Sequence, residues 1–586
     1  MFLISFYVLF FHFWPKLCVG MRLLIIMLAL AVPDAGGVDG TLREVSGMEG
    51  ILLITGASAE EDLDETVVER FESLHRHPLA INCCTRSRLI SSGLFSRYQI
   101  ASLLDYRERY GDVLSFTELA AVDGFGVKYA EALKDFVTLD GGEMDGGRSL
   151  KGRRKFSQSL MLRAAARAPD GEAEWCGGAK YQAKWGEFLE FNWADRTTYT
   201  LQELGLGTMN LSVYGRRVLG KLIVGDFNAR FGQGLLVWNG FSMSGVSSPS
   251  ALSRNGTGLS PSRSFSGGLH GVAADFNLGR YMVSAAYDRG NLALANLSRL
   301  GRIWQLGVTA VYDGSKEPLS GMGRFGLSLD TRIGFKGGSV FGEAALDGNA
   351  LAVVLGMLYV PSYGSMFSVL VRTYPKTYPG AMSGAVRSAS KVSDEYGASA
   401  AWQNGWSLLT LDAVWHPSKN TQGYKGIAQL KKTFQLGRLA LTPVLRVTER
   451  CSLKPSFEGR MVPDRRSDMR AELDTEIGPW LANVRYNAVH SAGWGSLVYA
   501  EAGYKSEGPR HSLTVWLRGE LFETDGWEDR IYVYERDAPG NFNVPAYYGK
   551  GWNASLVVSW KFWRNTLNLR VSTYKREVKL QYSLNL

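Results

Sequence analysis

Alternation of apolar and polar residues dominates the chain from residue 156 onward. The clearest case closes the chain, where polar residues are interleaved with Val578, Leu580, Tyr582, Leu584 and Leu586. A period of two puts successive side chains on opposite faces of a strand. Similar segments recur at residues 304–312 and 556–562, separated by turn signals rich in Gly, Asn and Asp. About two dozen strands are predicted in this way.

That number of strands favours a membrane barrel over a soluble sandwich, because a sandwich sheet rarely exceeds about ten strands. Residues 156–586 are therefore predicted to form a large antiparallel transmembrane β-barrel of about 20–24 strands, with outer-membrane lipid as its surroundings. Aromatic residues near strand ends suggest interfacial girdles: Tyr287, Tyr359, Tyr374, Trp415, Tyr504 and Trp563. A mean hydropathy of −0.09 argues against a bundle of transmembrane helices.

The N-terminus has the order of a secretory signal. Met21 and Arg22 precede the apolar run 23–32, and small and polar residues follow. We interpret residues 1–35 as a signal peptide with the true start at Met21. The alternative is one long uncleaved anchor over residues 1–33. Both interpretations predict export.

Charge divides the exported chain into two domains. Residues 60–140 contain 15 Asp and Glu against 9 Lys and Arg, whereas the chain from residue 156 is strongly basic. The stretch 141–155, GGEMDGGRSLKGRRK, is a Gly-rich basic linker. The predicted fold class is therefore α + β in separate domains: a small all-α module over 60–140, then the barrel.

The acidic module carries helical signals. Residues 98–110 place four apolar side chains on one face, and Ser115 followed by Glu118 predicts a capping box that opens the next helix. A tight hairpin with Gly124 and Gly126 then leads into another helix. Free amides at this hairpin, with Lys128 in the following turn, would attract an anion such as a phosphate.

This segment resembles the helix-hairpin-helix family, and more closely the tandem form found in periplasmic competence-type DNA receptors. The resemblance covers about sixty residues, 78–137. It implies phosphate contacts at the amides of Gly124 and Gly126 and at Lys128. The first repeat, 92–96, has one glycine where the family pattern has two, which implies a structural role only. The negative charge of the module opposes non-specific DNA binding, so a protein contact stays open as the other use.

Two features of the predicted barrel are candidates for chemistry. Asp226, Asn228 and Arg230 are expected to form an inward polar ladder, which either shapes a pore or only satisfies buried polar groups. The Ser/Gly-rich segment 242–268 is too long for a hairpin turn. It is expected either to fold into the lumen or to cover the barrel mouth.

A helical module ahead of a barrel, with the strings FGQGLLVW and YVYERDAPGNFNVPAYYGKGW, resembles a group of exported helix-hairpin-helix proteins of Gram-negative outer membranes. The resemblance implies an outer-membrane barrel with its module in the periplasm. The function expected is a channel or an assembly or docking component whose module contacts a periplasmic protein; the alternative is DNA binding or DNA uptake. Scattered histidines without a nucleophile signature, and cysteines without a CxxC or a Cys/His spacing, predict no enzyme, no metal site and no cofactor.

Overall fold

The computed structural model describes two stretches of the chain. They are residues 47–139, apart from 58, 59, 61, 62 and 64, and residues 156–586, apart from 169–171, 200–206, 216, 217, 241–244, 266, 267, 302, 316–322, 363, 364, 456–460, 509, 540 and 542. The predicted signal peptide, 1–35, and the predicted linker, 141–155, lie outside the described residues.

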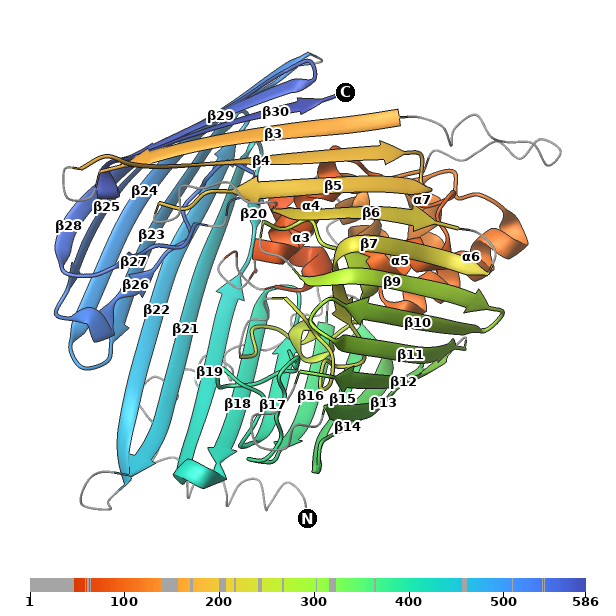
Figure 1. The fold of residues 1–586 in the computed structure, drawn as a ribbon. Coiled ribbons are helices and arrows are strands. Elements are labelled where there is room, and N and C mark those ends of the chain that lie inside the picture. The colour runs from red at the N-terminus through yellow and green to blue at the C-terminus, as the bar shows by residue number, and fades with distance from the viewer. Residues whose placement is uncertain are drawn as a thin grey trace.

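The second stretch forms a closed antiparallel barrel of 24 wall strands among the described residues (Figure 1). The first twelve are β3 Phe156–Arg167, β4 Glu174–Trp185, β5 Leu189–Arg196, β6 Thr208–Tyr214, β7 Leu219–Arg230, β9 Leu269–Leu278, β10 Tyr281–Asp288, β11 Leu292–Leu300, β12 Trp304–Asp313, β13 Arg324–Phe335, β14 Gly338–Asp347 and β15 Ala350–Ser362. The others are β16 Ser365–Tyr374, β17 Glu395–Gln403, β18 Ser407–His416, β19 Thr421–Lys431, β21 Leu439–Pro455, β22 Met461–Ile477, β23 Trp480–His490, β24 Trp494–Glu507, β25 His511–Thr524, β28 Lys550–Phe562, β29 Asn565–Ser572 and β30 Glu577–Asn585. β3 pairs with β30 and closes the ring. The predicted barrel is confirmed at the upper end of the predicted strand range.

The two faces of the wall have opposite polarity, as the alternation requires. Ser284, Asn296, Thr309 and Ser328 face one another across four successive strands and are buried on the inner side. Large apolar side chains lie exposed on the outer side, among them Leu211, Val272, Leu297, Leu329, Leu355, Val484, Leu517 and Leu521. An apolar outer surface around a polar lumen is the arrangement of an outer-membrane-type barrel.

The two edges of the barrel differ in the length of their connections. On the edge where β3 begins and β30 ends, short turns join the strands, such as Gly279–Arg280 between β9 and β10 and Gly478–Pro479 between β22 and β23. The opposite edge carries the long segments 231–268, 375–394 and 525–549. We call these the short-turn edge and the long-loop edge.

The first stretch forms a compact helical module, residues 47–139. Its helices are α3 Gly47–Thr55, α4 Glu65–Arg76, α5 Arg86–Ser92, α6 Arg97–Tyr110, α7 Phe116–Ala121 and α8 Val127–Leu133, and β1 Leu79–Ala80 pairs with β2 Val137–Thr138. Ile100 and Leu103 of α6 are fully buried, as their spacing predicted. The Ser115 hydroxyl accepts a bond from the Glu118 amide, as expected of a cap, but the Glu118 carboxylate accepts from Leu114 instead of Ser115. None of the described helices is long and apolar enough to span a membrane.

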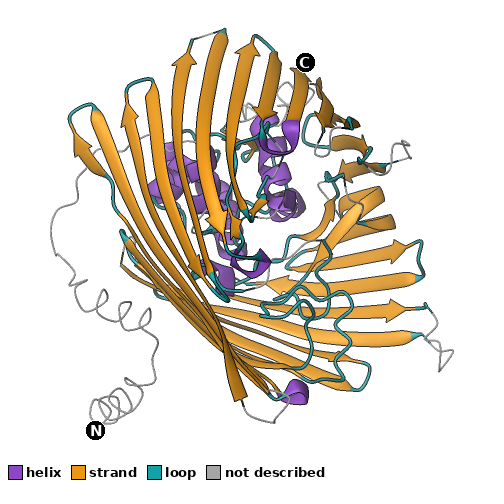
Figure 2. Ribbon diagram, turned by 90° about the vertical axis from the view of Figure 1, so that its left-hand side faces the viewer, coloured by secondary structure: helices purple, strands orange, loops and turns teal. Residues whose placement is uncertain are grey.

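The module lies inside the barrel, against the inner face of β3–β7 (Figure 2). Figure 1 shows α5, α6 and α7 toward the short-turn edge. The sequence indicated a separate domain on a linker and contained no sign of this docking. The barrel is therefore filled on one side by its own N-terminal module.

The three long segments also turn into the lumen. The insert 231–268 contains the short strand β8, Gly258–Pro261, and packs Leu235, Val237 and Leu252 with loop 375–394 into one buried apolar core. The segment 525–549 contributes β26, Ile531–Tyr532, and β27, Ala546–Tyr547, to a second core. Of the two alternatives for residues 242–268, the described part follows the lumenal one.

One of the predicted girdle residues is placed differently. Tyr374 is fully buried, and its hydroxyl donates to the Val386 carbonyl of loop 375–394 at 2.7 Å. Its prediction as an interfacial residue is wrong, because it belongs to the inner set of β16 and its ring forms part of the lumenal core. Trp415 and Trp563 are exposed, as expected of girdle residues.

Candidate functional site

Arg88 of α5 makes a buried ion-pair contact between the module and the barrel. Its Nε lies 3.2 Å from Glu187 Oε2, and its Nη1 lies 2.7 Å from Glu190 Oε2. The guanidinium also stacks 4.4 Å from the centroid of the Tyr214 ring. Only 5% of the Arg88 side chain is exposed. A planar guanidinium between two carboxylates and an aromatic face is a rigid, directional anchor.

Electrostatics hold this anchor in its charged form. Burial alone would lower the pKa of Arg88, but the combined charges around it, with Glu190 and Glu187 foremost among the carboxylates, outweigh burial and raise the pKa above its ordinary value. Arg88 therefore keeps its positive charge at neutral pH.

Glu190 joins three parts of the molecule. It stands on β5 and bonds Arg88 of the module, while its Oε1 lies 2.6 Å from Nη2 of Arg263 in the insert 231–268. The same oxygen also accepts from Gln182 and Asn192 of the wall. Wall, module and insert thus meet at a single carboxylate.

Further contacts extend along α4 and the turn after it. Lys180 Nζ on β4 lies 2.6 Å from Glu69 Oε1, and the Ser73 hydroxyl donates to Gln182. His77 is buried, and its ring hydrogen-bonds Ser159 on β3 at 3.1 Å. Burial, followed by the charge of Lys184, lowers the pKa of His77 to about 3. The docked module therefore carries this histidine in its neutral form.

The predicted hairpin adopts the expected backbone. Gly124 and Gly126 have φ values of +87° and +71°, and both are exposed, as is Lys128. The Gly126 amide donates to the Ala120 carbonyl at 3.2 Å, so one of the two amides assigned to phosphate contact is engaged within the module. At Gly124, a Cβ would lie 2.8 Å from the Tyr98 ring. The glycine therefore makes room for Tyr98.

The two hairpins of the module are tied to each other. Gln99 Nε2 donates to the Gly124 carbonyl at 2.8 Å, and Tyr129 donates to the Leu94 carbonyl. The rings of Phe95 and Phe125 lie 5.8 Å apart. The first hairpin thus supports the second.

The three residues of the predicted polar ladder, Asp226, Asn228 and Arg230, do not contact the same part of the protein. Asp226 accepts from the Met209 amide and lies 3.1 Å from His270 of β9. Asn228 and Arg230 both contact Asn239 of the insert: the Asn239 side chain donates to Asn228, and Arg230 Nε donates to the Asn239 carbonyl at 3.1 Å. Asn228 and Arg230 therefore hydrogen-bond the insert, whereas the side chain of Asp226 contacts other residues of the wall.

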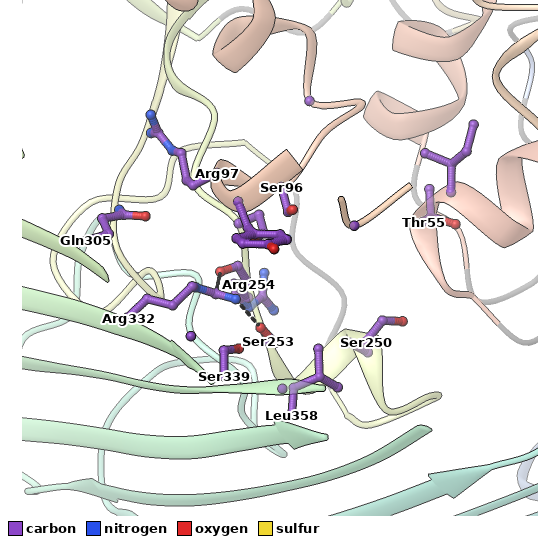
Figure 3. A pocket seen from close by; sticks show the side chains of 18 of the residues that line it. Thr55, Ser96, Arg97, Ser250, Ser253, Arg254, Gln305, Arg332, Ser339 and Leu358 are labelled. Atoms are coloured by element: carbon purple, nitrogen blue, oxygen red, sulfur yellow. Dashed lines mark hydrogen bonds between the residues drawn. The ribbon is translucent and has the colours of Figure 1, made fainter. Parts of the chain in front are cut away.

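A large cavity lies between the module, the insert 231–268 and the wall (Figure 3). Its volume is about 1060 Å³. Its cationic lining residues come from all three parts: Arg70, Arg97, Arg230, Arg254, Arg332 and Lys336. In the part of the chain that the structure describes, no Asp or Glu lines it. Tyr98, Trp238, Trp304 and Phe335 supply aromatic surface.

Figure 3 shows how the wall and the insert meet in this cavity. Arg332 of β13 reaches toward the insert, donating from Nη1 to the Ser253 hydroxyl and from Nη2 to the Arg254 carbonyl, both at 2.9 Å. Arg97 of α6 donates to the Gly256 carbonyl at 3.1 Å. Burial lowers the pKa of Arg97 to about 10, so the group stays charged at neutral pH.

Elsewhere in the lumen, buried cations face carboxylates. Lys221 lies 2.7 Å from Asp275, and Arg372 lies 2.6 Å from Glu395 and 2.8 Å from Asp412. Other such pairs are Arg518–Glu501 and Arg570–Glu535, and the half-buried Lys579 pairs with the buried Asp537. Paired charges of this kind are expected of a structural lumen rather than of a continuous track for a polyanion.

The sequence predicted no role in docking for Arg88, Glu190 or Arg263. The alternation of β5 does show that Glu190 shares the inner face with Asn192, so its position could have been found. Its partners could not, because they lie in elements far away in the chain. The histidines 270, 416, 490 and 511 lie on four different strands. Within the described ranges, no group of three or more His, Cys, Asp or Glu side chains could hold a metal ion.

Comparison with known proteins gives a likeness of fold. No family model matches the chain, and no curated protein matches it. The P pilus usher PapC translocation pore is 10% identical over 74% of this chain and 99% of its own, with a TM-score of 0.35. OpdK, an outer membrane protein of Pseudomonas aeruginosa, is 10% identical over 74% and 99%, with a TM-score of 0.30. OccAB3 of Acinetobacter baumannii is 8% identical over 74% and 98%, with a TM-score of 0.29. No functional argument follows from likenesses of this size.

Proposed function

We propose that this chain is an outer-membrane channel of a Gram-negative bacterium that is closed by its own module, residues 47–139, acting as a plug. The apolar outer face of the barrel supports the membrane location. The observation that carries the proposal is the buried Arg88 anchor, which holds the module on the inner wall. A soluble module on a tether would need no such lumenal ion pair.

The orientation of the barrel supports a periplasmic side for the plug. Outer-membrane barrels have short periplasmic turns and long extracellular loops, and an even number of strands brings both barrel ends to the periplasmic side. The start of β3 and the end of β30 both lie at the short-turn edge, and helices α5, α6 and α7 of the module lie toward the same edge. The plug would then be reached from the periplasm.

A periplasmic protein that releases the plug is the partner we propose. Tyr110 and Leu114 of the module are 72% and 81% exposed, a high exposure for large apolar side chains. Lys128 and Gly126 of the hairpin are also exposed. This surface is available while the Arg88 anchor is intact, so a partner can bind before the plug moves.

Conductance of the full-length protein in planar bilayers tests the proposal. A Cβ at Gly220 of β7 would lie 2.5 Å from the Ser87 hydroxyl of α5, so the two positions adjoin, and the double variant Ser87→Cys/Gly220→Cys is designed to join them by a disulfide after a small local shift. We expect low conductance in the wild type, openings in Arg88→Ala, and openings in Arg88→Ala/Ser87→Cys/Gly220→Cys only after reduction. Arg109→Ala, which removes an exposed pair on the same module, is the matched control. A conductance that is the same in all four proteins, with the barrel folded, refutes the plug.

DNA contact at the hairpin is the second candidate. It is favoured by the left-handed glycines and by the exposure of Lys128, and opposed by the engaged Gly126 amide and the paired lumenal cations. Titration of the full-length protein with labelled duplex and single-stranded DNA across a salt series tests it. Binding that weakens with salt and is lost in Lys128→Glu but kept in Lys134→Glu supports DNA contact. Equal binding by both variants, or none at low salt, refutes it.

A further inference from the structure

We propose that the segment 525–549 is held on the inner wall of the barrel by a proton that Glu520 carries and presents to Tyr547 and Glu535, and that rising pH releases the segment. This inference goes beyond the proposed plug, because it concerns the opposite, long-loop edge of the barrel. It is carried by the hydrogen bonds of three buried side chains.

The segment 525–549 lies against the inner wall. Figure 1 shows its strands β26 and β27 beside β23–β25, and Ile531 and Tyr547 pack into one apolar core with side chains of these wall strands. Arg518 of β25 donates to the Tyr534 carbonyl at 2.8 Å. The segment is therefore docked by apolar contacts and by polar bonds to the wall.

One phenol faces two carboxyl groups where the segment meets the wall. The Tyr547 hydroxyl hydrogen-bonds both Glu520 of β25 and Glu535 of the segment. All three residues are at most 3% exposed. A phenol carries one proton and donates one hydrogen bond, and an ionised carboxylate only accepts. One of the two contacts of Tyr547 therefore requires a second proton, which a carboxyl group must carry.

Asn553 of β28 does not supply that proton. Its side-chain oxygen accepts from the Tyr574 amide at 2.8 Å, so its NH₂ group points to the cluster. There it donates to Glu520 and, at 3.1 Å, to the Tyr547 oxygen. The amide adds bonds to the cluster, but it leaves the second contact of Tyr547 with a carboxyl group without a proton.

Glu520 is the carboxyl group that carries the second proton. Glu535 is paired with the Arg570 guanidinium, as an ionised carboxylate is. Among the described residues no salt bridge reaches Glu520, and Arg518 on the same strand is bonded to Glu501. Glu520 Oε2 is buried and has no hydrogen-bond partner in the described part of the chain. A buried oxygen without a donor costs far less on a neutral acid than on an anion.

The other titratable and charged groups around the cluster keep their charge state. They are Tyr499 and Glu501 of β24, Arg518 of β25, Arg570 of β29, Tyr574 after β29 and Glu577 of β30. Glu501 and Glu577 are bonded to Arg518 and Arg570, which favours their ionised form. Burial, and then the charge of Glu535, raises the pKa of the Tyr547 phenol well above its ordinary value, so the phenol keeps its proton. Glu520 is the group whose charge changes.

The direction of the pH effect follows from this protonation. On the wall Glu520 is a neutral acid, whereas a free glutamic acid loses its proton near about pH 4.3. Between pH 5.5 and 6.5 the docked segment therefore binds one proton more than the released segment, and docking weakens by up to about tenfold per pH unit as the pH rises. Loss of the proton places two anions on one phenol and drives the segment from the wall.

Hydrogen exchange of the full-length protein, read on peptides from the segment 525–549, tests the proposal. The protection factors, corrected for the intrinsic pH dependence of exchange, should fall about five- to tenfold from pH 5.5 to 6.5 in the wild type. Glu520→Gln keeps a neutral donor at this position, so the segment should stay protected without that dependence. Glu523→Gln is the matched control, because Glu523 lies on the same strand, is 64% exposed and pairs with Lys550. It should behave as the wild type does.

Two further measurements keep the proposal open to refutation if Glu520→Gln does not fold. The infrared carbonyl band of a buried carboxylic acid should be present at pH 5.5 in the wild type and in Glu523→Gln. Tyr547→Phe removes the phenol between the two carboxyl groups and should lower protection of the segment by about tenfold at pH 5.5.

The results that overturn the proposal are specific. They are wild-type protection that does not change between pH 5.5 and 6.5, a Glu520→Gln variant that loses as much protection as the wild type, and a Tyr547→Phe variant as protected as the wild type. A wild type without the carboxylic acid band has no such proton. A band that persists in Glu520→Gln and disappears in Glu535→Gln places the proton on Glu535 and overturns its assignment to Glu520.

Discussion

Removing the Arg88 guanidinium should loosen the plug without unfolding the barrel. In Arg88→Ala, Glu187 and Glu190 lose the cation that both of them face, although Arg263 still accompanies Glu190. Deleting one partner of a buried ion pair costs about 3–5 kcal/mol. At about 1.4 kcal/mol per factor of ten, the docked state becomes about 100- to several-thousand-fold less favoured. Arg109→Ala breaks a pair that is about half exposed, worth about 1 kcal/mol or less.

Amide hydrogen exchange of the full-length protein measures this loosening directly. Amides of α5 and α6 should exchange faster in Arg88→Ala by a factor of at least 100, while amides of distant wall strands such as β23 keep their wild-type rates. Arg109→Ala should match the wild type in both regions. The reasoning fails if α5 is as protected in Arg88→Ala as in the wild type. It also fails if wall and module lose protection together, since the ion pair would then stabilise the barrel as a whole.

Three further predictions concern the plug and the lumen. Burial, and then the charge of Lys184, lowers the pKa of His77 to about 3 from its ordinary 6.5. Below pH 6.5 a released module therefore binds a proton at His77 that the docked module does not bind. The contribution of His77 to the free energy of docking is complete above pH 6.5 and falls by about 1.4 kcal/mol per pH unit below it. The protection factors of α4 amides, which are corrected for the intrinsic pH dependence of exchange, should therefore fall about fivefold from pH 6.5 to 5.5 in the wild type. A His77→Gln variant whose protection factors fall as much as those of the wild type would contradict this. Gly124→Ala should destabilise the module by about 1–3 kcal/mol, because it needs a positive φ and meets the Tyr98 ring, and an unchanged midpoint in thermal proteolysis of the module would count against it. Arg372→Ala leaves Glu395 and Asp412 without their buried cation, and Glu395 accepts hydrogen bonds from Ser388 of loop 375–394. The loop should therefore be held less firmly, by about 3–5 kcal/mol, and added protease should cleave it faster. Resistance equal to the wild type would show that the pairs do not hold the loop.

The strand pattern predicted the wall well because alternation is a local property. Leu580 and Gln581 of β30 lie on the outer and inner faces, as their polarity indicated, and the Ser115 cap begins α7 as expected. The contents of the lumen could not be predicted in this way. Alternation shows that Glu190 points inward, but it does not show whether water, a loop or a helix meets it there. Tyr374 illustrates the same limit, because the sequence pattern of an aromatic residue at a strand end is the same whether its side chain faces the lipid or the lumen.

The candidate site was predicted only in its local geometry. Gly124 and Gly126 do take left-handed conformations, because a two-glycine hairpin between helices permits little else. The cavity, in contrast, draws on α6, on the insert and on β13, which are distant in sequence. These elements come together only when the ring closes, so no sequence motif can predict the cavity.

The position of the module ahead of the barrel strands in the sequence has a consequence for the order in which the barrel assembles. Arg88 and Glu69 of the module form ion pairs with β4, β5 and the turn between them, which follow the module in sequence. The ring closes only when β30, the last strand, meets β3. The module can therefore seat on a partial, open sheet, and the seam then encloses it. We expect the docked module to act as a template for the first strands when folding follows this order, so loss of the Arg88 anchor should also slow the assembly of newly made chains.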